Sequence, residues 1–91
     1  MEDNIHDYPI DGVLDLHMFQ PREVKSVLNE YLHECRTRDI LQVRIIHGKG
    51  KGVLRDIVHS YLENSAEVVE YSTASDSSSW GATLVLLAPH K

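Results

Sequence analysis

Apolar and polar residues alternate early in the chain, and this two-residue period is typical of a β-strand with one buried face. Residues 10–17 follow the pattern. One face carries Leu14 and Leu16, and the other carries Val13, Asp15 and His17. Later apolar, β-branched runs predict three more strands, at residues 41–46, 66–71 and 82–88. In residues 41–46, Val43, Ile45 and Ile46 leave little room for polar groups on either face, so we expect that strand in the centre of a sheet.

Two segments show the three- and four-residue spacing of an amphipathic helix. The first begins at Pro21, a residue that fits the first helical position because its missing N–H costs nothing there. Its apolar stripe consists of Val24, Val27, Leu28, Tyr31, Leu32 and Cys35. The second runs to about Asn64, with a stripe of Val53, Leu54, Ile57, Val58, Tyr61 and Leu62. Both stripes are expected to face the core.

The expected order of elements is therefore β-α-β-α-β-β. Strand–helix–strand units favour parallel strands with right-handed crossovers, and the last two strands, joined by a polar loop at residues 72–81, are free to pair antiparallel. This order predicts an α/β two-layer sandwich with a four-stranded mixed sheet and two helices on one face. We expect residues 1–9 to form a flexible lead-in and residues 10–91 to form one domain.

Composition excludes several classes of protein. The 91 residues are 42% hydrophobic and 25% charged, which argues against disorder. Cys35 is the single cysteine, so it forms no internal disulfide and no thiolate zinc site, and we expect a core position for it in a reducing, cytoplasmic protein. Apolar runs all fall short of the ~20 residues that span a bilayer, so no membrane is expected as a partner.

The charge distribution points to a local anion site. Net charge is −5, but the window from Arg44 to Arg55 carries +4 and no acidic residue, so the remainder of the chain carries −9. Its basic residues are Arg44, Lys49, Lys51 and Arg55. A basic patch on an acidic body fits a phosphate ligand better than a broad polyanion-coating surface.

Glycines alternate with lysines between the second predicted strand and the second helix. The residues are Gly48, Lys49, Gly50, Lys51 and Gly52. Glycine permits positive φ, and free N–H groups at a helix start bind anions. The spacing matches neither the mononucleotide P-loop nor the dinucleotide-binding pattern. A tight turn with solvated lysines is the competing interpretation. Trp80, in the polar loop, either stacks on a base or covers an edge of the core.

Two histidines are predicted to meet beside this loop. His17 ends the first predicted strand and His47 follows the second, and neighbouring strands run about 4.8 Å apart, so we expect two imidazoles side by side. One histidine would deprotonate an attacking hydroxyl or water while the other protonates the leaving oxygen. Asp15 would orient an imidazole or bind a divalent metal such as Mg or Mn. Alternatively, His17 only caps the first helix and Asp15 is only solvated. His33 and His59 are expected at the surface or helix boundary.

Residues 14–17 (Leu-Asp-Leu-His), followed by a helix, and residues 46–50 (Ile-His-Gly-Lys-Gly), opening the next, resemble the Smr (small MutS-related) domain in its stand-alone form. The glycine-led last strand, from Gly81, is also similar to that family. The resemblance implies a fold like the C-terminal domain of translation initiation factor three, nucleic-acid binding, and in several members nicking of DNA or RNA. The first family motif corresponds here to Asp15, Leu16 and His17, and the second corresponds to His47, Gly48 and Gly50. Met18 departs from the pattern, which has glycine there.

Three functions remain open at this point. The leading hypothesis is a nicking endonuclease for structured DNA or RNA, with Asp15, His17 and His47 as catalytic residues. The second is a nucleic-acid-binding module without catalysis. The third is an adaptor whose acidic body binds a protein.

Overall fold

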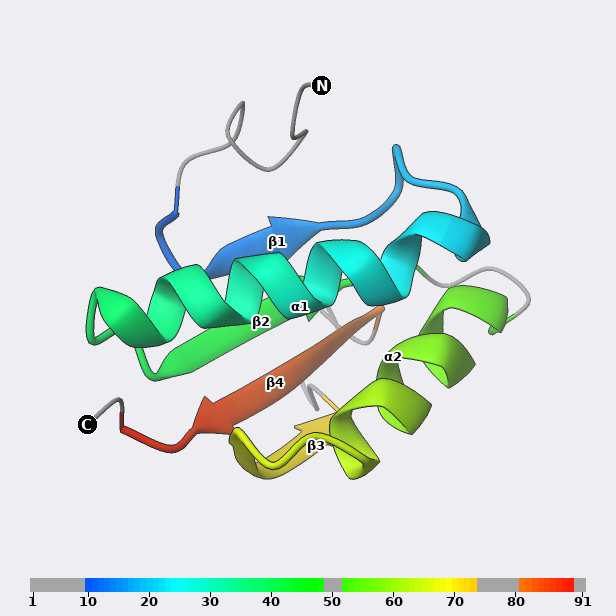
Figure 1. Cartoon of the computed structure of the whole chain (residues 1–91). Helices are drawn as coiled ribbons and strands as arrows, with labels where there is room; N and C mark the ends of the chain where they lie inside the picture. The colour runs from blue at the N-terminus through cyan, green and yellow to red at the C-terminus, as the bar shows by residue number, and fades with distance from the viewer. Residues whose placement is uncertain (1–9, 49–51, 74–80, 90–91) are drawn as a thin grey trace.

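The structure is a computed structural model that describes residues 10–48, 52–73 and 81–89. The elements are β1 (Val13–Asp15), α1 (Pro21–Thr37), β2 (Gln42–Ile46), α2 (Val53–Glu63), β3 (Val68–Thr73) and β4 (Ala82–Leu87). Both helices lie on the same face of the four-stranded sheet (Figure 1). The predicted two-layer β-α-β-α-β-β arrangement is confirmed. The predicted lead-in at residues 1–9 and the site residues Lys49, Gly50, Lys51 and Trp80 lie outside the described residues.

The sheet has the order β1-β2-β4-β3. β1 and β2 are parallel neighbours, whereas β4 pairs antiparallel with both β2 and β3. β2 is therefore central, as its apolar character predicted. β4 is also central because it enters between β2 and β3, and its side chains are mostly buried, while those of the edge strand β3 are exposed or half-buried. The two sequence neighbours β2 and β3 thus do not pair.

β1 has the predicted alternation but is shorter than expected. Leu14 and Leu16 are buried, whereas Val13, Asp15 and His17 are exposed. The ladder begins after Gly12, whose φ of 94° is outside the strand region and whose missing Cβ would lie 3.1 Å from the carbonyl oxygen of Gln42. Beyond Asp15 the chain turns, because the N–H of Phe19 donates to the carbonyl of Leu16 at 2.9 Å. His17 therefore lies in a turn rather than at a strand end.

α1 is attached to β1 by a buried tyrosine. Pro21 occupies the first turn, and the N–H of Gln20 donates to the carboxylate of Glu23 at 2.9 Å, which caps the helix start. The hydroxyl of Tyr31 accepts from the N–H of Gly12 and donates to the carbonyl of Val13, both at 3.1 Å. Two backbone groups at the start of a short strand are thereby satisfied from the helix.

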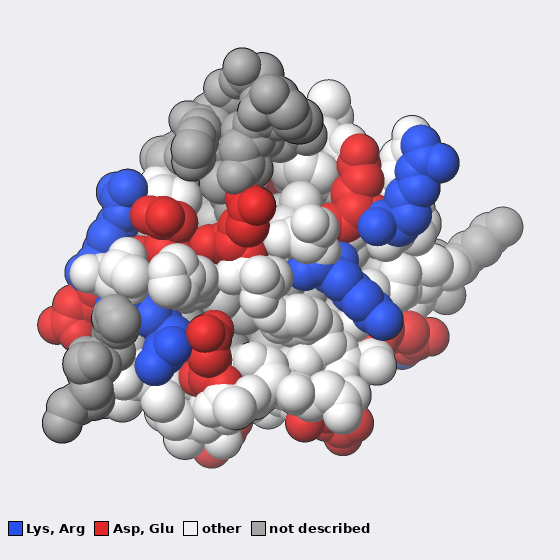
Figure 2. All heavy atoms as spheres, in the orientation of Figure 1, with Lys and Arg blue, Asp and Glu red and all other residues white. Residues whose placement is uncertain are grey.

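Cys35 belongs to the buried stripe of α1, as predicted. Burial raises the pKa of its thiol to about 11, so the thiol is neutral and unreactive near pH 7. Among the described residues, neither helix has the length and apolar character to cross a membrane. Figure 2 shows acidic and basic side chains interspersed over the helix-covered face, so the described part of that face presents both signs of charge. A site for a polyanion is better sought at the edge of the sheet.

Candidate active site at the carboxyl ends of β1 and β2

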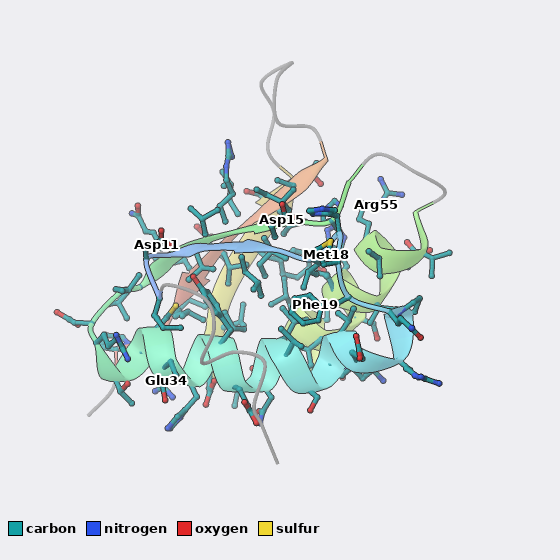
Figure 3. All side chains as sticks on the ribbon, turned by 90° about the horizontal axis from the view of Figure 1, so that it is seen from above. Asp11, Asp15, Met18, Phe19, Glu34 and Arg55 are labelled. Carbon is teal, nitrogen blue, oxygen red and sulfur yellow. The ribbon has the colours of Figure 1, made fainter. Side chains whose placement is uncertain are left out.

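Four elements meet at one edge of the sheet. Asp15, the last residue of β1, pairs with Ile46, the last residue of β2. Immediately beyond β2, the N–H groups of His47 and Gly48 both donate to the carbonyl of Gly81, at 2.9 and 2.8 Å, just before β4 begins. Figure 3 shows Asp15, Met18 and Arg55 of α2 along this same edge, with Asp11 at the opposite end of β1. The parallel β1–α1–β2 unit thus brings Asp15, His17, His47 and Gly48 to its carboxyl end.

Asp15 and His17 form a hydrogen-bonded pair. The Oδ1 of Asp15 accepts from the backbone N–H of His17 at 3.0 Å and lies 2.9 Å from its ring Nδ1. A carboxylate only accepts, so we assign the proton to Nδ1, which leaves Nε2 with a free lone pair. The His17 side chain is 66% exposed, so this nitrogen is open to a ligand. Asp15 therefore orients an accessible imidazole.

The pair also changes the acidity of Asp15. Partial burial raises the pKa of the carboxyl, but the hydrogen bonds from the amide and ring of His17, with the charge that this ring carries when protonated, together outweigh burial. The net pKa lies below its ordinary value. Asp15 is consequently ionised at neutral pH, the state in which it holds the ring of His17.

His47 is directed to different partners. It is only 6% exposed, its Nδ1 lies 3.2 Å from the carbonyl oxygen of Gly48, and its Nε2 lies 2.8 Å from Thr83 Oγ1. Burial lowers its pKa, the hydrogen bond that its ring makes to the Gly48 carbonyl raises it, and the charges of His59 and Arg55 lower it further. The ring is thus neutral at pH 7, with both nitrogens engaged inside the protein.

The two predicted histidines follow neighbouring strands, but their rings bind different partners. His17 shares the exposed face of β1 with Asp15, whereas His47 follows the buried residues of β2 and reaches the fully buried Thr83. The expectation of side-by-side imidazoles assumed that both residues extend their strands in register. Instead, His17 lies in a turn, and the side chain of His47 continues the alternation of β2 on the face that the helices cover.

His59, which the sequence placed at the surface or at the boundary of the helix stripe, is a further member of this edge. It is half-buried on α2, and its Nε2 lies 2.8 Å from Thr83 Oγ1. Its ring centroid is 6.2 Å from that of His47, at an edge-on angle of 84°. Burial and the charge of Arg55 lower its pKa. The signal for this contact was Thr83 itself, a hydroxyl at a buried-face position in an otherwise apolar strand.

The described ends of the glycine loop both need glycine. Gly48 has φ of 83° and Gly52, the residue before α2, has φ of 86°. L-residues with side chains rarely adopt this region. The carbonyl of Gly52 accepts from the N–H of Asp56, which starts the helix. Amides of the first turn of a helix lack partners within the helix, and helix starts of this kind are common anion-binding sites.

The two predicted arginines have different locations. Arg55 is exposed on the first turn of α2, where its charge acts on both His47 and His59. Arg44 pairs with Val13 and Leu84 within the sheet. It lines a hollow of about 520 Å³ on the face opposite the helices. Arg55 therefore belongs to the edge, and Arg44 to the adjoining open face.

Met18 replaces the glycine of the family pattern without backbone strain. Among the described residues, Asp39 is the one non-glycine with positive φ, so Met18 adopts an ordinary backbone conformation. Its side chain is 73% exposed at the edge that Figure 3 shows. The consequence of this substitution is therefore confined to side-chain bulk near His17. Within the described residues, no group of three or more histidine, cysteine or acidic side chains is arranged to hold a metal ion.

Comparison with protein families assigns this chain to a family. The model of the Smr domain matches residues 14–88, and the chain belongs to the Smr domain family. It is 37% identical over 73 residues to Endonuclease MutS2 of Streptococcus mutans, covering 79% of this chain and 9% of that protein. It is 30% identical over 81 residues to Ribosome rescue factor SmrB of Tolumonas auensis, covering 89% of this chain and 45% of that protein. The chain thus spans less than half the length of either relative.

Solved structures agree on the fold. The Smr domain of Thermus thermophilus MutS2 superposes with a TM-score of 0.81 at 28% identity, covering 87% of this chain and all of that one. YdaL, a stand-alone small MutS-related protein from Escherichia coli, superposes with a TM-score of 0.77 at 24% identity, covering 96% of this chain and 76% of that one. The mixed sheet with two helices is therefore the Smr fold.

Proposed function

We propose that this Smr domain binds structured DNA or RNA and hydrolyses a phosphodiester bond in one strand. The observation that carries the proposal is the exposed imidazole of His17, oriented by Asp15 at an edge where α2 begins. An accessible imidazole with a free Nε2 suits proton transfer near neutral pH. Relatives that bear the name Endonuclease MutS2 support the same reaction class.

In the proposed reaction, a phosphate of the backbone approaches the first turn of α2 and the glycine loop. His17 Nε2 accepts the proton of the attacking hydroxyl or water as its oxygen bonds to phosphorus. The bond from phosphorus to the leaving oxygen then breaks, and that oxygen takes up a proton from water. Asp15 stabilises the imidazolium that forms. His47, whose two ring nitrogens are engaged, contributes by holding the loop in place.

Positive charge around the edge would hold the nucleic acid. Arg55 is exposed beside the site, and Lys49 and Lys51 precede it in the chain. Arg44 would meet a strand that continues over the open face. Phosphate contacts of this kind make binding salt-dependent, with log K falling as log[salt] rises.

The second candidate is a binding module without cleavage. It is favoured by His47, because a buried ring with both nitrogens engaged offers no second proton-transfer group to a substrate. The relative that bears the name Ribosome rescue factor SmrB is a reason to include RNA among the ligands tested.

The experiment compares the protein with His17→Ala, His47→Ala and His33→Ala, the last changing an exposed histidine of α1. Each is incubated with supercoiled plasmid and with structured RNA, with and without EDTA. We expect nicking by the parent and by His33→Ala, and a loss of about 100-fold or more in His17→Ala. Salt-sensitive binding without product in the parent would establish the binding module instead. Cleavage by His17→Ala at the parent rate would contradict the proposed mechanism.

A further inference from the structure

Thr83 Oγ1 connects two imidazoles from different elements. It lies 2.8 Å from Nε2 of His47, which follows β2, and 2.8 Å from Nε2 of His59 on α2. Thr83 is fully buried on β4, so its hydroxyl has no solvent to bond with. We propose that Thr83 and His59 are positioning residues that set the ring tautomer and orientation of His47, and through it the start of the glycine loop. This inference rests on the proposed function of that loop.

The chemistry of the groups gives the chain of hydrogen bonds one direction. The carbonyl oxygen of Gly48 only accepts, so the contact with His47 Nδ1 requires the proton on Nδ1. In a neutral imidazole, Nε2 is then bare and accepts from the Thr83 hydroxyl. That hydroxyl has one hydrogen, so it must accept from its other neighbour, and His59 Nε2 supplies the donor. All the bonds are satisfied by neutral rings, His47 protonated on Nδ1 and His59 on Nε2.

The chain of bonds reaches the loop through His47, the residue before it, and Gly48, its first residue. The backbone amides of His47 and Gly48 are bound to Gly81, and the His47 ring is bound to the carbonyl of Gly48. If the ring rotates or changes tautomer, the Gly48 carbonyl loses its donor. A buried polar network of this kind favours one arrangement only when every member is satisfied.

His59 is itself held by its surroundings. Its ring lies 5.0 Å from the ring of Tyr71 on β3, with planes tilted by 50°. Of the charged groups on its own helix, Arg55 disfavours the protonated ring and Asp56 and Glu63 favour it. His59, the donor at the end of the hydrogen-bond chain, is therefore carried by α2 and packed against β3, and Figure 1 shows these two elements on the same side of the molecule.

The test uses pairs of variants that differ in hydrogen bonding. Thr83→Val removes the hydroxyl at nearly constant volume, and Thr83→Ser restores it. His59→Leu removes the donor, and His59→Gln restores an N–H. His33→Leu on α1 is the matched control. Two properties are measured for each: the nicking rate on supercoiled plasmid, and the protonation of the His47 ring nitrogens by two-bond ¹H–¹⁵N NMR.

We expect the parent to show His47 protonated on Nδ1. Thr83→Val and His59→Leu should shift it towards a mixture of tautomers and lower nicking about 10-fold or more, as is usual when an orienting bond to a functional imidazole is lost. The Ser and Gln variants and the control should resemble the parent. An unchanged His47 spectrum in Thr83→Val would overturn the inference. Equal nicking rates and equal His47 spectra in Thr83→Val and Thr83→Ser would also overturn it, because the effect would then not depend on the hydroxyl.

The two proposals fail in different ways. If the parent does not nick while the His47 tautomer responds to Thr83→Val, the endonuclease assignment fails and the positioning chain stands. If the parent nicks and His17→Ala does not, but Thr83→Val and His59→Leu retain the parent rate and tautomer, the positioning inference fails alone. Near-UV circular dichroism identifies any variant that has lost the native packing. If Thr83→Val or His59→Leu does so, the comparison of Thr83→Ser or His59→Gln with the parent decides whether the inference holds.

Discussion

Asp15 makes two contacts with His17 through one carboxylate oxygen, which lies 3.0 Å from the backbone nitrogen of His17 and 2.9 Å from its ring Nδ1. The first contact shapes the turn after β1, and the second orients the ring. A single residue therefore sets both the path of the chain and the tautomer of the proposed base. Local structure and proposed chemistry depend on the same side chain.

Replacing this carboxylate separates the two contacts. Asp15→Asn keeps an oxygen that accepts from the His17 amide but removes the charge that stabilises an imidazolium. We expect the thermal midpoint to change little and nicking to fall by about 10- to 100-fold at neutral pH. Initial rates on supercoiled plasmid measure the effect, with Asp11→Asn, at the opposite end of β1, as a matched control. Equal rates for both variants would exclude a role for the Asp15 charge.

Stability should depend on pH through His47 and His59. Burial lowers the pKa of both below the ordinary value of 6.5, so the unfolded chain binds these protons more readily than the folded one. Their contribution to stability is complete above about pH 6.5 and is lost as pH falls from there towards the folded pKa values. Urea unfolding at about pH 7.5 and pH 5.5 should give the lower free energy of unfolding at pH 5.5. The drop should be smaller in a His47→Gln, His59→Gln double variant; an equal drop would place its origin elsewhere.

Tyr31→Phe tests the attachment of α1 to β1. The ring stays in the core, but the amide of Gly12 and the carbonyl of Val13 lose their partner in the hydroxyl. We expect a loss of about 1–3 kcal/mol in the free energy of unfolding, the usual cost of leaving buried groups unpaired. Chemical denaturation measures it, and Tyr61→Phe, whose hydroxyl contacts exposed Asn29, is the control with little effect. Similar losses in both variants would show that the contacts with β1 have no special role.

Met18→Gly restores the family residue beside His17. Because Met18 adopts an ordinary backbone conformation and is 73% exposed, little packing is lost, and the expected cost is about 0.5–1 kcal/mol from added chain entropy. Removing its bulk should raise the nicking rate of a duplex several-fold if the side chain narrows the approach to His17. Met18→Ala, which shortens the side chain without adding flexibility, should share the gain. A rate that stays level or falls in both would show that Met18 does not limit access.

Much of the fold was predictable because it depends on local periodicity. The alternation around Leu14 and Leu16 and the stripe of α1 identified buried faces correctly, since each pattern is read within one element. Glycine at both described ends of the loop was likewise expected from its need for positive φ. The motif around Asp15 and His17 involves residues two apart, so their proximity follows from the chain itself.

What the sequence determined alone, then, is the type and order of the elements, their buried faces, and the pair Asp15–His17. The tertiary structure decided that β4 enters between β2 and β3, and that His47 turns to Thr83 and His59 rather than to His17. The reason is physical. Thr83 is 36 residues from His47 and 24 from His59, and such contacts depend on which strands pair and in what register.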